Sequence, residues 1–106
     1  MNIIGKFTAV DDGYTGSVQT LPFSGPVTLD AVKEKAGENS PDFRAFTVRA
    51  RQQGRIQIGA AWKERSEGGK AYLGVRLDDP SFPVPIYCRL IQLDGEESHS
   101  LIWSRN

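Results

Sequence analysis

A chain of 106 residues suits one domain covering residues 1–106, and its 39% hydrophobic and 25% charged residues indicate a soluble globular protein rather than a disordered one. No apolar run approaches the roughly 20 residues of a membrane span, and the start, MNIIGKF, lacks the pattern of a signal peptide. The lone cysteine, Cys88, excludes an internal disulfide, and a net charge of zero argues against a general polyanion binder. We therefore expect a cytoplasmic protein that does not bind membranes.

Alternating apolar and polar residues between closely spaced glycines and prolines predict a small antiparallel β protein. The first strand is expected near Ile3–Val10 and the second near Tyr14–Leu21, joined by a tight turn at Asp11-Asp12-Gly13. The next segment, Val27–Lys35, fits either a strand or two turns of helix that stop at Gly37, and we favour the strand.

Five further strands are expected along the rest of the chain. They lie near Phe43–Ala50, Arg55–Arg65, Ala71–Asp78, Pro85–Leu93 and Ser98–Ser104. Because the connections are short, neighbouring strands are expected to pair as a meander. We predict an all-β fold, a small antiparallel meander curled into a barrel or a sandwich, with at most one short helix.

Basic residues are concentrated in the middle of the chain. The segment Arg44–Arg76 holds eight basic and two acidic residues, whereas the remainder holds five basic and eleven acidic ones. Strict alternation places Trp62 in the core and turns the polar residues of two neighbouring strands towards solvent. The residues expected on that basic hairpin face are Arg55, Lys63, Arg65, Lys70, Tyr72 and Arg76.

Two interpretations of this face remain open. Its lysines and arginines could neutralise phosphates while Tyr72 stacks on a base, as in proteins that bind single strands. Alternatively, it is a solvated sheet face whose charges only keep the protein soluble.

Phe82, in the proline-rich stretch DDPSFPVPIY, also has two interpretations. Its ring could plug one end of the sheet, with Pro80 and Pro83 fixing the corner, or it could be an exposed anchor for a protein partner. We favour the plug.

Other residues that could carry chemistry have simpler structural explanations. Asp78 and Asp79 stand before a proline, where aspartate commonly forms turns, although paired carboxylates also serve cation sites and acid–base catalysis. His99 and Cys88 are the sole members of their types, whereas zinc sites usually need three or four such ligands. Cys88 alternates with apolar residues and is expected in the core. We expect no metal, no cofactor and no catalytic site.

The stretch IGAAWKERSEGGKAYLGVRLDDPSFPVPIY, together with SLIWSR, ENSPDFRAF and the N-terminal IGKFT, resembles a family of small bacterial proteins known as domain of unknown function seven-three-six. The resemblance covers nearly the whole chain. It implies a protein of plasmids and integrative conjugative elements of proteobacteria, and it brings no catalytic residues. Small β-rich proteins of such elements tend to handle DNA or to block a host defence.

We therefore expect a non-enzymatic accessory protein of a mobile genetic element that contacts nucleic acid through the basic hairpin face. The alternative is an inhibitor that binds a host defence protein complex, such as a CRISPR effector. The oligomeric state is left open.

Overall fold

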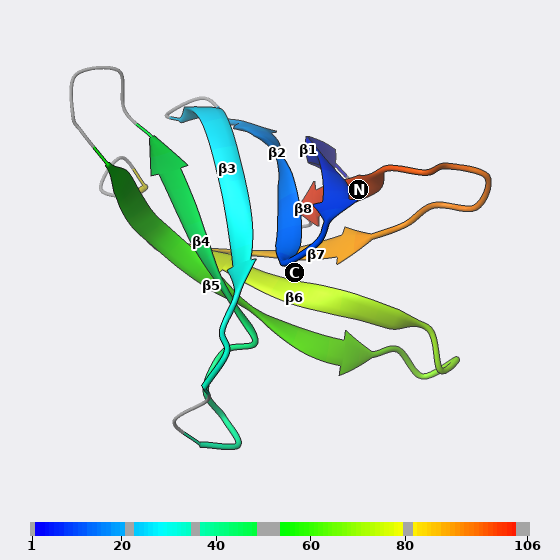
Figure 1. Ribbon diagram of the computed structural model, residues 1–106. Helices are drawn as coiled ribbons and strands as arrows, with labels where there is room; N and C mark the ends of the chain where they lie inside the picture. The colour runs from blue at the N-terminus through cyan, green and yellow to red at the C-terminus, as the bar shows by residue number, and fades with distance from the viewer. Residues whose placement is uncertain (1, 21–22, 35–36, 49–53, 80–81, 104–106) are drawn as a thin grey trace.

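The computed structural model describes residues 2–20, 23–34, 37–48, 54–79 and 82–103. Within these ranges the chain forms eight antiparallel strands. The strands are β1 (Asn2–Val10), β2 (Gly13–Gln19), β3 (Ser24–Ala31), β4 (Phe43–Val48), β5 (Arg55–Arg65), β6 (Ala71–Leu77), β7 (Ile86–Ile91) and β8 (His99–Trp103). Each strand pairs with its neighbour in sequence, and β8 pairs back with β1, so the sheet closes into a barrel (Figure 1). The predicted all-β meander is confirmed, and its form is a barrel.

The ambiguous segment after the second strand is a strand, as favoured, but β3 both starts and ends earlier than the expected Val27–Lys35. Strand β3 includes Pro26, which lies opposite Ser17 of β2. The expected strand ends at Leu21, Lys35, Ala50 and Ser104 lie outside the described residues, as does Pro80. No helix among the described residues is long and apolar enough to cross a membrane.

The core consists of side chains that alternate inwards from the strands. Its largest fully buried members are Phe7, Leu29, Leu77, Leu90 and Leu101. Complete burial of one such side chain stabilises the folded protein by about 1.5–3 kcal/mol. Cys88 also belongs to this core, as predicted, and burial raises the pKa of its thiol to about 12. The thiol is therefore protonated at neutral pH and acts as a small apolar side chain.

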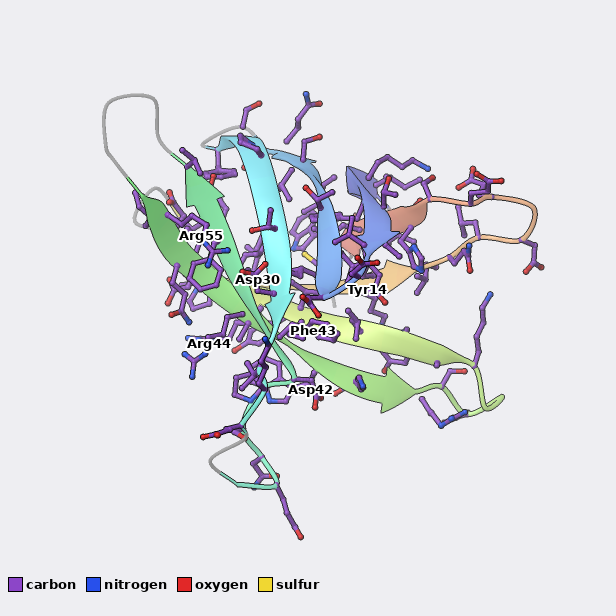
Figure 2. The ribbon with its side chains drawn as sticks, viewed as in Figure 1. Tyr14, Asp30, Asp42, Phe43, Arg44 and Arg55 are labelled. Carbon is purple, nitrogen blue, oxygen red and sulfur yellow. The ribbon has the colours of Figure 1, made fainter. Side chains whose placement is uncertain are left out.

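The two ends of the barrel are filled differently. At one end, Phe82 packs against the core with its ring centroid 6.4 Å from that of Phe23, which agrees with the plug interpretation of Phe82. At the other end, Tyr14 makes edge contacts with Phe43 and His99, at centroid distances of 5.7 and 5.1 Å. Figure 2 shows Tyr14 and Phe43 at this second end, beside the projecting β5–β6 hairpin.

A β-bulge in β5 decides which way the second half of that strand faces. Ala45 of β4 lies opposite Gly59 and Phe46 lies opposite Gln57, so Ile58 is an extra residue without a cross-strand partner. As a result Ile58 and Ala61, three positions apart, are both buried, with exposed fractions of 3% and 0%. Strict alternation would have placed them on opposite faces.

Every side chain of β5 after the bulge is therefore on the face opposite to the predicted one. Lys63 lies opposite Leu73 on the inward side, whereas Trp62 lies opposite Gly74 on the outer surface. The prediction that Trp62 belongs to the core is wrong, because it assumed an unbroken period of two.

Glycine at position 59 allows the bulge to pack against β6. A Cβ atom there would lie 2.0 Å from the carbonyl oxygen of Arg76, closer than any real contact. We therefore expect Gly59→Ala to lower the free energy of unfolding by about 1–3 kcal/mol, the usual range for overpacking. Gly37→Ala is the control, because nothing lies within 4 Å of a Cβ added at Gly37.

Urea unfolding curves of the parent and the two variants measure this difference. Equal midpoints for Gly59→Ala and the parent would show that β5 and β6 do not approach as closely as described.

Candidate nucleic-acid interface

The residues predicted to form one basic hairpin face do not share a surface. Lys63 and Arg65 lie on the inward side of β5, where the hairpin extends beyond the barrel, opposite Leu73 and Ala71. Lys70 stands in the turn of that hairpin, with its Nζ 3.8 Å from a carboxylate oxygen of Asp94. The single basic face is therefore a wrong prediction.

Arg55 lies on another part of the barrel wall. Its guanidinium forms an ion pair with Asp30 of β3, and its Cζ lies 4.2 Å from the ring centroid of Phe46. Figure 2 shows Arg55 and Asp30 beside β3, β4 and β5. Because both its charge and its flat face are already in contact with the protein, Arg55 is a poor candidate for a ligand contact.

Tyr72 and Arg76 remain together on the outer surface, and the bulge brings other side chains to them. Neighbouring strands place Trp62, Gly74 and Arg89 opposite one another in one row, and Arg76 opposite Tyr87 in another. Three aromatic side chains and two arginines thus occupy the outer face of β5, β6 and β7. We call this set the aromatic platform, consisting of Trp62, Tyr72, Arg76, Tyr87 and Arg89.

A hollow of about 320 Å³ lies within the platform, next to Gly74. Gly74 presents no side chain there, and a Cβ at this position would lie 3.0 Å from a carboxylate oxygen of Glu64. Glycine therefore keeps the floor of the hollow at the level of the β6 backbone, and the carboxylate of Glu64 lies over it.

Contacts on either side of Tyr72 hold its ring in place. Its hydroxyl donates a hydrogen bond to the carboxylate of Glu64, and this bond, more than desolvation or the charge of Glu64, raises the pKa of Tyr72. The Cζ atom of Arg89 lies 5.4 Å from the ring centroid, within the range of a cation–π contact. The tyrosine is thus neutral, oriented and adjacent to a cation.

The other two aromatic side chains differ in exposure. Tyr87 has an exposed fraction of 66%, unusually high for a large aromatic side chain. Trp62 is half-buried, and its Nε1 donates a hydrogen bond to the carbonyl oxygen of Asn39, 3.1 Å away. The bond tethers the indole to the segment that precedes β4, so the ring is held at the border of the platform.

Sequence reasoning missed Tyr87 and Arg89, although the signal was present. Cys88 was correctly assigned to the core from its alternation with apolar neighbours, and the same alternation turns Tyr87 and Arg89 outwards. Trp62 was missed for a different reason, because the bulge that displays it has no clear pattern in the sequence.

The remaining candidate residues have structural roles. The side chain of Asp78 forms an ion pair with Arg76 at 3.5 Å, and the carbonyl oxygen of Asp79 accepts a hydrogen bond from the backbone N–H of Phe82 at 2.8 Å. These contacts fit the expected turn after β6. Within the described ranges, no group of three or more His, Cys, Asp or Glu side chains could hold a metal ion.

Fold and surface together define a small closed β-barrel with an aromatic and basic patch on its outer wall. A family model described as protein of unknown function, DUF736, matches residues 3–106, so the chain belongs to this family. The resemblance stated from the sequence is thereby confirmed. Neither the curated proteins nor the solved structures include a match to this chain.

The position of Trp62 on the outer wall has a measurable consequence for stability. We expect Trp62→Ala to cost less than about 2 kcal/mol, because it removes one hydrogen bond worth about 1 kcal/mol and only partly buried apolar surface. Phe7→Ala, which empties a position that is 2% exposed, is expected to cost about 3–5 kcal/mol. Urea unfolding of both variants measures the two losses of unfolding free energy. Equal losses would show that Trp62 belongs to the core.

Proposed function

We propose that this protein binds single-stranded nucleic acid across the aromatic platform. The observation that carries the proposal is the convergence of Trp62, Tyr72 and Tyr87 with two arginines on the outer face of three adjacent strands. Stacked bases and neutralised phosphates are the two contacts that proteins of this type use without reading sequence.

The spacing of the platform supports contact with more than one base. Neighbouring strands lie about 4.8 Å apart, so aromatic rings on β5, β6 and β7 offer separate stacking surfaces. Arg89 has no ion-pair partner among the described residues and lies beside Tyr72, where a phosphate next to a stacked base could reach it. Arg76 lies opposite Tyr87 and forms an ion pair with Asp78.

The charge of the protein favours a single strand over a duplex. Duplex binders depend mainly on phosphate contacts from many basic residues, whereas this chain has a net charge of zero and its platform has two arginines. Stacking requires bases whose flat faces are accessible, and a paired duplex covers those faces. Most of the binding free energy is therefore expected from the aromatic side chains.

The proposal is of a binding role without catalysis, in an accessory protein of a mobile genetic element. The element is inferred from the resemblance to a family that is typical of plasmids and conjugative elements. The platform supplies the physical basis for contact with a single strand, through stacking on Tyr72 and Tyr87.

Fluorescence anisotropy with a labelled oligothymidine of about 16 nucleotides, the upper end of the usual site size, tests the proposal. We expect binding at low salt and weaker binding to a duplex of the same length. Tyr87→Ala should weaken binding by about 1–3 kcal/mol, or roughly 5- to 150-fold, since it removes one stacking surface. Its high exposure means that this substitution should leave the urea midpoint almost unchanged.

The arginines are tested by the dependence of affinity on salt. Arg89→Gln should reduce the slope of log affinity against log salt by about 0.7, the value for one phosphate contact on a single strand. Arg55→Gln removes the same charge from another part of the wall and should leave the slope unchanged. If the parent binds no oligonucleotide at low salt, or if both arginine variants behave alike, the proposal is wrong, and a protein partner such as a host defence complex takes its place.

A further inference from the structure

A second, larger hollow lies at the end of the barrel marked by Tyr14 and Phe43. Its volume is about 810 Å³, within the range of pockets that hold small molecules. The β5–β6 hairpin forms one wall and the turn after β7, residues 92–96, forms the other; both project on the same side of the barrel (Figure 1). We call this hollow the mouth cavity.

The floor of the mouth cavity is apolar and partly aromatic. Leu73 and Leu90 belong to the buried core, and Phe43 is 8% exposed. Tyr14 stands edge-on to Phe43, and its ring forms part of the same lining. A flat apolar group placed here would cover rings and aliphatic side chains that the barrel leaves open at this end.

The wall formed by β5 carries two basic side chains. Lys63 and Arg65 both lie on the inward side, and neither side chain forms an ion pair among the described residues, whereas the backbone N–H of Lys63 donates to Asp42 Oδ2 at 2.8 Å. Arg65 only donates through Nη1 to the carbonyl oxygen of Gly69, at 3.0 Å. These two cations therefore line the cavity without a side-chain ion pair in the part of the chain that the structure describes.

The acidic residues that also line the cavity have basic or polar partners of their own, and one of these partners, Lys70, belongs to the same lining. Asp94 pairs with Lys70, and Glu96 pairs with Lys6 at 3.3 Å. The carboxylate of Glu64 lies against Gly74 on the outer face, where it accepts the hydrogen bond from Tyr72. The lining thus combines an apolar floor with three basic and three acidic residues, and its two basic side chains without an ion pair among the described residues, Lys63 and Arg65, share the β5 wall.

His99 adds a polar atom that lacks a partner. Its Nδ1 is buried and makes no hydrogen bond within the described part of the chain, although the residue lines the cavity. Burial lowers the pKa of His99, so the ring is neutral at pH 7 and has one donor and one acceptor nitrogen. An unsatisfied buried group of this kind lowers stability, and because Nδ1 is closed to solvent, a ligand in the cavity does not contact this atom.

We propose that the mouth cavity is a binding site for an aromatic anion, a molecule with a flat ring system and a carboxylate, sulfonate or phosphate group. The ring lies against Phe43, Leu73 and Leu90, and the anionic group is bound by Lys63 and Arg65. The cations of this site lie on the inward side of β5 and the platform lies on the outer side, and the two hollows share Glu64 and Tyr72 at their border. It does not depend on the proposed binding of nucleic acid.

Titration with anilinonaphthalene sulfonate, an aromatic anion that fluoresces when it leaves water, tests the site. We expect the folded parent to bind one probe molecule. Lys63→Gln and Arg65→Gln should each weaken binding by about tenfold, the equivalent of about 1.4 kcal/mol. Ala71→Glu provides a second test, because position 71 lies directly opposite Arg65 and the new carboxylate would neutralise its charge. This variant should lose the probe while it stays folded by circular dichroism.

Phenylnaphthylamine, which has the same rings without the sulfonate, separates charge from apolar contact. It should bind the parent, Lys63→Gln and Ala71→Glu with similar affinity. Lys33→Gln, which removes an exposed lysine outside the cavity, and Tyr87→Ala, which removes a platform ring, should not alter binding of the sulfonate. The proposal is overturned if the folded parent does not bind the sulfonate, or if Lys33→Gln weakens binding as much as Lys63→Gln does.

Discussion

The extra residue in β5 is the constraint on which both surfaces of this protein depend. Ile58 fills the core without a partner in β4, and after it the side chains of β5 face the opposite way to an unbroken alternation. One face of the β5–β6 hairpin then carries Trp62 and the other carries Lys63. Without the bulge the indole would point into the barrel and the lysine away from it. A single inserted residue thus sorts the aromatic and the cationic side chains of one strand onto opposite sides of the wall.

Closure of the sheet determines how this sorting can be used. A flat sheet would present both faces of the hairpin to solvent in the same way, whereas a barrel makes one face convex and the other part of its interior. The outer face offers the exposed ring of Tyr87 and the half-buried ring of Tyr72, suited to an extended ligand that passes across the surface. The inner face, continued beyond the barrel by Lys63 and Arg65, borders a hollow suited to a compact ligand. The proposed sites therefore differ in shape as well as in charge.

The strands could be predicted from the sequence because alternation and turn residues recur throughout the chain. Even the less certain third strand was assigned correctly, and Cys88 was placed in the core. The orientation of β5 could not be predicted, because the run Ile58-Gly59-Ala60-Ala61 consists of apolar or small residues that fit either face. Only the cross-strand contact with β4 selects the bulged arrangement. Because the prediction did not include this one extra residue, it placed on a single face residues that lie on two different faces.

The pairing of β1 with β8 links the first and last parts of the chain directly. Asn2 lies opposite Trp103, and Lys6 Nζ donates to Ser100 Oγ at 2.9 Å across 94 positions of sequence. Loop-closure entropy opposes such a contact until the intervening strands have shortened the effective loop. The barrel therefore closes only after β8 has left the ribosome, and until then the nascent chain exposes the unpaired edge of β1. The lysine at position 6 places a charge on that temporary edge, where it discourages pairing with another chain during synthesis.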